Sequence, residues 1–465
     1  INQAMKHCTN CKKAFEVTLE DKEFLRKLSP IIDNKIFLLP EPNFCIDCRQ
    51  QRRAAQGNQL FLYKRKCNKS QKEVITNYHP DEPYKVYAME IWHGDDWDSL
   101  EYGRDYDFNR PFFEQYQELL LAVPHPALHR GFQYDENSDY TNYAGRNKNC
   151  YLIFDSEDNW DCFYCYSINK TKDCLDCYRV RKSELCYECI DCINCYSSLY
   201  LQDSENCSDS MFLKNCIGLK NCIMCVNLRN KEYHIKNKPV SKEEFEKYKA
   251  QLLSSEEKLQ EALALFNTAK LQFPQPYYHG VNNENIVGDY LLNSKGAYHC
   301  FDSEDLWDCR YVYQAFMPLK DCMDIQECGE AELMYESCFA GYSGFRCSFI
   351  IHALGTPSDM VYTNHCPHSK YLFGCFGLKR KQYCILNKQY SKEEYNALVP
   401  KIIEHMKSTN EWGEFFPISL SPFAYNETLA QVYYPLTKEQ ALAKDYKWRD
   451  KDRSEYRPAT AQVPQ

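Results

Sequence analysis

Cysteines recur with a 12-residue period in the middle of this chain, and this spacing limits its fold more than any other feature. Thirteen cysteines lie between Cys150 and Cys225. A fixed short period over several repeats is typical of a stacked repeat protein, in which each coil contacts its neighbours. Side chains one coil apart then lie above one another. The clearest rows are Cys150, Cys162, Cys174 and Cys186, and Cys165, Cys177 and Cys189.

The segments between the cysteines predict β-strands. Short apolar and Tyr-rich stretches are separated by Asn, Asp, Ser and Lys, which favour tight turns. We therefore expect a right-handed parallel β-solenoid with rows of Cys pointing inward. A 12-residue coil would have room inside only for small side chains such as Cys, Ser and Ala. A coil of about twice that length with two Cys-bearing faces fits the spacing equally well, so the sequence leaves the coil length open.

The cysteine-rich region is duplicated. The segment FDSEDNWDC at 154–162 recurs as FDSEDLWDC at 301–309, and their tryptophans should occupy matching positions. Each block is followed by a Ser-Lys-Glu-Glu-aromatic segment, starting at Ser241 and Ser391. Ser at the N-cap with Glu at the third helical position predicts a capping box, and hence a helix after each block.

These features predict a mainly β chain with α additions, in six parts. We expect helices at Leu19–Leu28, Pro111–Leu121 and 391–407, and a helical hairpin or a long helical rod at 241–270. The parts are a zinc-ribbon module at 1–75, an aromatic and acidic connector with a short helix at 76–145, the first Cys-rich β-solenoid block at 146–235, a helical insertion at 236–275, the second β-solenoid block at 276–390, and a helix with an extended C-terminal tail at 391–465.

The most specific chemical signal is a pair of CxxC motifs near the N-terminus, formed by Cys8, Cys11, Cys45 and Cys48. Each CxxC knuckle offers two thiolates, and Zn²⁺ takes four such ligands in a closed structural site. A closed site has no open position for a substrate, so its role would be in folding. We predict one structural Zn²⁺ here. The alternative is four unrelated buried thiols.

Residues 8–53 resemble zinc-ribbon domains that end in a CxxCR segment followed by further arginines. The stretches Tyr63–Asp98 and Tyr102–Glu114 are similar to an uncharacterised family of zinc-ribbon proteins with Cys-rich repeats, found mostly in genomes assembled from environmental bacteria. The resemblance covers nearly the whole chain and implies no established activity.

This family pattern implies a second pair of knuckles, near Cys67 and after Val86-Tyr87. Here these positions read Cys67-Asn-Lys-Ser and Ala88-Met-Glu-Ile, so one of four ligands remains. We therefore expect no second zinc there. The pattern also implies another zinc ribbon beyond the end of this sequence.

Positive charge is concentrated beside the predicted ribbon. Residues 1–75 carry +7 and the rest of the chain carries −16, which together give the net charge of −9. Phosphate neutralisation combined with aromatic stacking is typical of nucleic-acid binding, so RNA or the ribosome is a candidate partner. The alternative is a face that pairs with the acidic body of the same molecule. The candidate residues are Arg49, Arg52, Arg53, Lys64, Arg65 and Lys66.

Two further motifs lie within the repeats. Redox CxxC pairs usually occur once, at a helix start, whereas this chain has five tandem copies. Buried Cys acts as a small hydrophobe, and we favour that role over internal disulfides or extra metal. The tripeptide Asp-Ser-Glu at 155–157, 203–205 and 302–304 could bind Ca²⁺, but turn formation at solenoid corners explains it as well.

Composition also bears on location. The longest apolar runs are far too short for a membrane span of roughly 20 residues. No secretory signal is visible, although a sequence that begins with Ile1 is compatible with a removed leader. An odd count of 27 cysteines with many CxxC pairs fits reduced thiols better than a full disulfide framework, which favours the cytoplasm.

Function is only weakly constrained. No Ser/His/Asp order, P-loop or dinucleotide-binding Gly motif argues for an enzyme, and we expect no catalytic residues. The favoured hypothesis is a zinc-binding scaffold that presents a Tyr-rich solenoid surface to a protein partner or to another copy of itself. The first alternative is an RNA- or ribosome-associated factor that uses the basic end. The second is a thiol redox or metal-storage protein.

Overall fold

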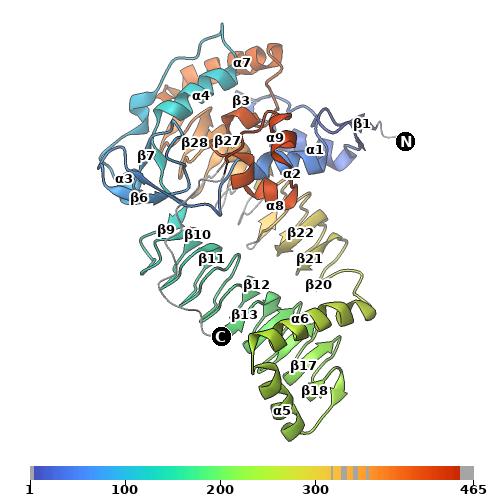
Figure 1. The fold of residues 1–465 in the computed structure, drawn as a ribbon. Coiled ribbons are helices and arrows are strands. Elements are labelled where there is room, and N and C mark those ends of the chain that lie inside the picture. The colour runs from blue at the N-terminus through green and yellow to red at the C-terminus, as the bar shows by residue number, and fades with distance from the viewer. Residues whose placement is uncertain (1–4, 316–317, 326–331, 339–343, 352–354, 451–465) are drawn as a thin grey trace. The chain divides into compact units, whose positions relative to one another are not determined.

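The computed structural model describes residues 5–315, 318–325, 332–338, 344–351 and 355–450 (Figure 1). It is mixed α and β, with more strand than helix. The chain forms two compact units. Unit 1 comprises Ile1–Ala127 and Tyr277–Arg449, and unit 2 comprises Leu128–Pro276 and Asp450–Gln465. The predicted division into six parts is finer than this one and stays a prediction.

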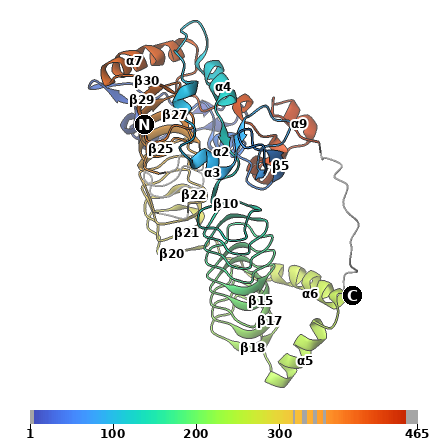
Figure 2. The same cartoon turned by 90° about the vertical axis from the view of Figure 1, so that its left-hand side faces the viewer.

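From β10 to β18, each strand of unit 2 pairs in parallel with the strand one 12-residue coil further on. Leu199 pairs with Met211, and Met211 pairs with Ile223. This register selects the shorter of the two coil lengths that the sequence left open. Figure 2 shows the coils stacked between β10 and β18, with α5 (Lys242–Leu252) and α6 (Glu256–Ala269) beside them. The strands of unit 2 are β9 (Arg130–Gly131), β10 (Thr141–Gly145), β11 (Ile153–Glu157), β12 (Tyr178–Arg181), β13 (Glu184–Tyr187), β14 (Ile190–Ile193), β15 (Tyr196–Gln202), β16 (Met211–Lys214), β17 (Lys220–Val226), β18 (Glu232–Ile235) and β19 (Lys238–Pro239).

Every third residue of these coils has a positive φ. For example, Asp158, Asp161 and Tyr164 have φ values of 58°, 54° and 56°. Each of these residues turns the chain, so one coil has four corners and four short sides. Asn and Asp enter this left-handed conformation more readily than other non-Gly residues, which explains their frequency at the corners. From Cys150 to Cys225, the residue after each corner is buried inside the coil. The two cysteines of a CxxC pair therefore lie on adjacent sides.

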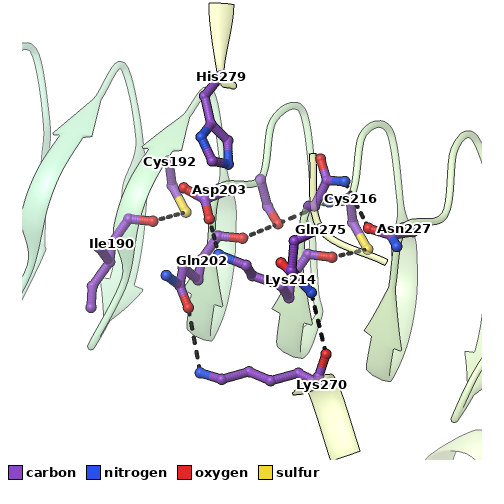
Figure 3. Close-up of polar contacts among 12 residues, drawn as sticks. Ile190, Cys192, Gln202, Asp203, Lys214, Cys216, Asn227, Lys270, Gln275 and His279 are labelled. Carbon is purple, nitrogen blue, oxygen red and sulfur yellow. Dashed lines mark hydrogen bonds and ion pairs between the residues drawn. The ribbon is translucent and has the colours of Figure 1, made fainter. Parts of the chain in front are cut away.

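The interior of unit 2 is lined by thiols that donate hydrogen bonds to the backbone. Cys162 and Cys192 are buried, and each Sγ lies 3.2 Å from the carbonyl oxygen two residues earlier. Ser204, one coil after Cys192, makes the same contact with the Gln202 oxygen at 2.9 Å. Figure 3 shows this bond for Cys192 and, two coils on, for Cys216. Cys and Ser therefore make the same hydrogen bond at these positions.

The same side chains also accept hydrogen bonds from the next coil. The Cys177 N–H donates to Cys165 Sγ at 3.4 Å, and the Cys195 N–H donates to Ser183 Oγ at 3.0 Å. These N–H groups lie inside the coil, where a donor without a partner costs about 1–3 kcal/mol. Small side chains that both donate and accept satisfy this need. The narrow coil thus explains the abundance of Cys and Ser.

A pair of substitutions at Cys165 tests this account. Cys165→Ser keeps a donor and an acceptor, so its stability should stay close to that of the parent. Cys165→Ala leaves the Cys177 N–H without its acceptor and should cost about 1–3 kcal/mol. Thermal and urea unfolding of the two variants would measure the difference. Equal stability of the two variants would contradict the proposed role of the thiol.

The second Cys-rich block lies in unit 1 and has a less regular register. Gly280 pairs with Leu291, an interval one residue shorter than in unit 2, whereas Phe345 pairs with Ser358, an interval one residue longer. These single-residue changes blur the 12-residue period in the sequence. The strands of this block are β20 (Gly280–Val281), β21 (Val287–Leu292), β22 (Tyr298–Glu304), β23 (Leu306–Trp307), β24 (Leu319–Lys320), β25 (Glu332–Tyr335), β26 (Phe345–Ile351), β27 (Ser358–Asn364), β28 (Lys370–Phe373), β29 (Gln382–Ile385) and β30 (Lys388–Gln389).

The two blocks match in their pairing and in their ends. Trp160 pairs with Lys148 and Lys172, and Trp307 pairs with lysines on both sides in the same way. Each block ends in an antiparallel hairpin followed by a helix that has the predicted capping box, built on Ser241 in one block and on Ser391 in the other. The two blocks therefore share these strand pairings and the same sequence of elements at their ends.

The helices after the blocks lie where the sequence predicts them. At 241–270, where we expect a hairpin or a long rod, the chain forms two helices, α5 and α6, because Ser255 caps a new helix, and η2 (Lys270–Gln272) follows. The helix expected at 391–407 is α7 (Lys392–Ser408).

The predicted extended tail is instead a series of short helical turns as far as it is described, and residues 451–465 lie outside the described part. These turns pack on the N-terminal module through bonds such as Gln51 Nε2 to Tyr425 Oη at 2.7 Å and Ser421 Oγ to the Ala55 oxygen at 2.7 Å. They are η3 (Ile418–Leu420), η4 (Tyr425–Glu427), α8 (Leu429–Tyr433) and α9 (Lys438–Leu442).

The N-terminal part of unit 1 combines hairpins with helices. The predicted helix at Leu19–Leu28 is α1, and the one predicted at Pro111–Leu121 is α4, with Pro111 as its N-cap. The elements are β1 (Lys6–His7), β2 (Ala14–Phe15), α1 (Leu19–Leu28), β3 (Ile31–Ile32), β4 (Lys35–Ile36), α2 (Ile46–Ala54), β5 (Tyr63–Lys66), β6 (Glu73–Thr76), β7 (Val86–Tyr87), α3 (Met89–His93), η1 (Ser99–Tyr102), α4 (Phe112–Ala122) and β8 (His125–Pro126).

Candidate metal centre

The first knuckle is the turn between β1 and β2. The Cys8 N–H donates to the Lys13 oxygen and the Lys12 N–H donates to the Cys8 oxygen, both at 2.9 Å. Lys12 has a φ of 64°, which reverses the chain tightly. These contacts bring Cys8 and Cys11 to the same side of the turn.

The second knuckle is the start of α2. Cys45 is the N-cap of this helix and makes no side-chain capping bond, and Cys48 lies in its first turn. The positive end of the helix dipole favours negative charge on both sulfurs. The Thr9 N–H donates to the Asn43 oxygen at 3.0 Å, which holds the two knuckles together.

The four thiols converge to a spacing that fits a metal ion. Their sulfur atoms all lie within 4.8 Å of one another, and the Sγ atoms of Cys11 and Cys45 are 3.6 Å apart. A tetrahedral zinc–thiolate site, with Zn–S bonds of about 2.3 Å, places its sulfurs about 3.8 Å apart. Within the described ranges, this is the one cluster of three or more Cys, His, Asp or Glu side chains with such spacing. The predicted residues can therefore hold a metal ion.

The surroundings shift the pKa values of Cys45 and Cys8 in opposite directions. Burial raises the pKa of Cys45 to about 11. Burial also acts on Cys8, but hydrogen bonds from the backbone N–H groups of Cys45, Cys11 and Asn10 outweigh it and lower the pKa of Cys8 to about 6. Asn10 Nδ2 also donates to Cys48 Sγ at 3.3 Å. The cluster thus receives several donors, which suits a set of metal-bound thiolates.

A second hairpin and helix repeat this architecture around Cys67. The Cys67 N–H donates to the Lys72 oxygen and the Gln71 N–H donates to the Cys67 oxygen, both at 2.9 Å, as in the first knuckle. Gln71 has a φ of 61°, and Ala88 is the N-cap of α3. The other three ligand positions hold Ser70, Ala88 and Ile91. Cys67 Sγ instead accepts the N–H groups of Ser70 and Ala88, at 3.4 and 3.3 Å.

The backbone around Cys67 and Ala88 matches that of the first pair of knuckles. We therefore expect that cysteines placed at the other three ligand positions would create a second metal site. The triple variant Ser70→Cys, Ala88→Cys and Ile91→Cys should bind one more Zn²⁺ per chain than the parent, measured by elemental analysis of purified protein. The control Ser70→Ala, Ala88→Ser and Ile91→Val changes the same positions without adding thiols. A folded triple-Cys variant with no additional metal would show that the two knuckle pairs are not equivalent.

The arginines predicted to bind nucleic acid are buried, which corrects that prediction for three of its six residues. Arg49, Arg52 and Arg53 lie on α2 and face the second Cys-rich block. Arg49 Nε lies 2.5 Å from Asp324, and Arg52 lies 2.7 Å from Glu336. Arg53 lies 3.5 Å from Asp324. These guanidinium groups pair with the acidic body of the same molecule and do not face solvent.

The other three basic residues lie on β5. Lys64 is exposed and lies 3.4 Å from Glu73. Arg65 is half-buried and donates to the backbone oxygens of His79 and Tyr84, and burial lowers its pKa. Lys66 is exposed. Nucleic-acid binding by these three residues stays a prediction.

The buried arginines should matter more for stability than the exposed lysine. Arg49→Ala removes the nearer of the two arginine partners of the fully buried Asp324 carboxylate and leaves only Arg53 at 3.5 Å. Removing one member of a buried pair costs about 3–5 kcal/mol. Lys64→Ala is the matched control and should unfold like the parent, because its ion pair is exposed. Thermal unfolding would measure both variants. A stable Arg49→Ala protein would contradict the importance of this contact.

The Asp-Ser-Glu tripeptides are corners of the coils. In each, Ser points inward, and Ser156 Oγ and Ser204 Oγ bond the oxygen two residues earlier at 2.7 and 2.9 Å. The preceding Asp155 and Asp203 have φ values of 51° and 49°. This geometry agrees with the turn-forming role that the sequence favours.

The repeat cysteines that the structure describes are shielded from solvent inside the coils. Every cysteine of the repeats within the described part of the chain is buried, and none of them forms a disulfide bond. Burial raises the pKa of Cys347, Cys366 and Cys384 to about 12, so these sulfurs carry protons and can donate them in hydrogen bonds. Structural thiols of this kind are inert.

Comparisons with known proteins identify no family. No family model matches the chain, and no curated protein matches it. Among solved structures, it is similar to a candidate acetyltransferase from Desulfovibrio desulfuricans G20, with 11% identity over 57% of this chain and 69% of that chain, and a TM-score of 0.13. A likeness this low carries no argument about function. None of the helices in the described ranges is long and apolar enough to cross a membrane.

Proposed function

We propose that this chain is a non-enzymatic scaffold in which a zinc ribbon is docked on a Cys-rich parallel β-solenoid. The main support for this proposal is the position of helix α2. The first turn of α2 holds Cys45 and Cys48, and its next residues, Arg49, Arg52 and Arg53, bind carboxylates on the corners of the second Cys-rich block. A metal that fixes the start of α2 would therefore also fix the side chains that dock it.

Zinc is the metal we propose for the cluster of Cys8, Cys11, Cys45 and Cys48. Four thiolates in a closed tetrahedral arrangement favour Zn²⁺ over the hard cations, which prefer oxygen ligands. Bound zinc would supply the folding free energy that so small a module lacks. Four protein ligands would fill the tetrahedral positions and leave no open position for a substrate.

The repeat supplies the rigid part of the scaffold. A right-handed parallel β-solenoid with 12-residue coils, duplicated within the chain, is our interpretation of the register and of the matching ends of the two blocks. Exposed aromatic side chains in unit 2, among them Tyr151, Phe163 and Tyr164, supply a surface of the kind that is enriched in interfaces. A protein partner or a second copy of the chain would bind there. Free thiols suit the reducing cytoplasm.

The two alternative functions have less support. Binding of RNA or the ribosome would depend on Lys64, Arg65 and Lys66, because the three arginines of α2 are occupied. Thiol redox chemistry or metal storage would need accessible sulfurs, whereas those of the repeats donate to backbone oxygens inside the coils. The scaffold is therefore the function that we propose.

Removal of zinc tests the proposal. Purified protein should contain one zinc ion per chain, and a chelator or the variant Cys45→Ser/Cys48→Ser should remove it. Because α2 then loses its anchor, hydrogen exchange should rise in α2 and also in β25, which precedes Glu336. Exchange in β12–β17 of unit 2 should not change. Mass spectrometry would measure both regions.

Cys67→Ser is the matched control, because it changes a buried thiol outside the cluster and should leave the zinc content unchanged. Correctly folded protein without zinc, or loss of zinc with no change in α2, would contradict the proposed function.

A further inference from the structure

The two Cys-rich blocks carry the same column of corner residues. Equivalent strand pairings show how the two blocks align. The pairing of Phe163 with Leu175 in unit 2 corresponds to that of Arg310 with Met323 in unit 1. The pairing of Lys172 with Glu184 corresponds to that of Lys320 with Glu332. All the corner residues in this column have positive φ. The column reads Tyr164, Asp176, Glu188 and Tyr200 in unit 2, and Tyr311, Asp324, Glu336 and Phe349 in unit 1.

The packing of neighbouring rings supports this alignment. The rings of Tyr151 and Tyr164 are 5.8 Å apart, and those of Tyr298 and Tyr311 are 5.9 Å apart. Further along the column, the ring centroids of Tyr187 and Tyr200 are 5.5 Å apart. The corresponding rings in unit 1, Tyr335 and Phe349, are 5.4 Å apart. Both blocks therefore present two stacked carboxylates between aromatic side chains at matching positions.

In unit 1 this column is the receptor for α2. Asp324 lies near Arg49 and Arg53, and Glu336 is held by two contacts of the Arg52 guanidinium at 2.7 and 2.8 Å. Arg49 also lies over the ring of Tyr311, 5.3 Å from its centroid. As a result Asp324 and Glu336 are 0% and 1% exposed. Two carboxylates on adjacent coils thus bind arginines at helix positions i, i+3 and i+4.

In unit 2 the same column is open to solvent. Asp176 and Glu188 are exposed, and neither forms an ion pair with any residue that the structure describes. Tyr164 is 54% exposed, whereas its counterpart Tyr311 is 5% exposed. Partial burial and the negative charge of Asp176 raise the pKa of Glu188.

A covering helix stops just beside this column. Phe266 of α6 packs on Phe212, which stacks on Tyr200, as Phe112 of α4 packs on Tyr362 in unit 1. No helix that the structure describes covers the apolar surface on the far side of Tyr200. This surface includes Leu175 and Phe163, which directly precede the column residues Asp176 and Tyr164 and are 37% and 40% exposed. The open column is therefore continuous with an existing helix interface.

We propose that this face of unit 2 binds an arginine-bearing helix of a partner protein. The partner helix carries arginines at i, i+3 and i+4, which pair with Asp176 and Glu188, and its apolar side chains contact Phe163, Tyr164 and Leu175. The chain's own α2 is engaged by Asp324 and Glu336, so the helix comes from another molecule. This inference deepens the proposed scaffold function, on which it rests, by naming the chemistry of the partner.

A helical peptide based on α2 provides the probe. The stapled peptide has the sequence of residues 44–56 with both cysteines replaced by serine, and its binding to the full chain is followed by fluorescence anisotropy. We expect one bound peptide per chain. Asp176→Asn/Glu188→Gln should weaken binding by at least about tenfold, because arginine–carboxylate pairs in an interface are costly to break. The control Glu205→Gln/Asp209→Asn, on other sides of the coils, should bind like the parent.

A peptide in which the three arginines are replaced by glutamine should not bind. No binding of the arginine peptide, or equal binding by the parent and Asp176→Asn/Glu188→Gln, would overturn the inference. Stability offers a second readout. Asp324→Asn/Glu336→Gln should lower the melting temperature and Asp176→Asn/Glu188→Gln should not, since only the first pair is occupied. An equal loss of melting temperature in the two double variants would also overturn the inference.

These outcomes are separate from a failure of the proposed function. If the peptide does not bind but removal of zinc still releases α2, only the inference about the partner fails. If removal of zinc leaves α2 protected, the scaffold proposal itself fails.

Discussion

Each 12-residue coil of unit 2 changes direction four times, and most other features of the repeats follow from this constraint. A corner at every third residue needs a left-handed conformation, which Asn and Asp adopt at least cost. The sides are so short that the interior admits few large side chains. Some backbone N–H groups point into that interior and need acceptors there. Cys and Ser fit because each is small and can both donate and accept, as at Cys165 and Ser204.

The corners also determine what the outer surface can bind. Residues in one corner column lie on successive coils, so strand spacing places their side chains about 4.8 Å apart. Two acidic residues in such a column repel each other unless a cation lies between them. In unit 1 the arginines of α2 supply that charge, and the same helix begins at the cysteine cluster. The metal site and the repeat are therefore linked through a single helix.

Much of this arrangement could be predicted from the sequence. The cysteine period predicted the inward rows, the repeated FDSED segments predicted the duplication, and the paired CxxC motifs predicted the metal cluster. A further signal in the sequence marks the corners: Asp or Asn directly precedes nine of the thirteen cysteines between Cys150 and Cys225, as at Asp161, Asp173 and Asn194. The shorter and longer coils of unit 1 could not be predicted, because a single deletion or insertion removes the period without leaving a motif.

The burial of the α2 arginines was also beyond prediction, since the carboxylate partners of Arg49 and Arg52 lie 275 and 284 positions further along the chain. Positive charge next to a zinc ribbon resembles a nucleic-acid surface until those partners are known. The central claim is that metal binding and docking of α2 stabilise each other, and linkage requires the effect to be reciprocal. Competition with a chelator would measure zinc affinity in the parent and in Asp324→Asn/Glu336→Gln. The account predicts about tenfold weaker zinc binding in the variant, which corresponds to about 1.4 kcal/mol of coupling, and an unchanged affinity would contradict it.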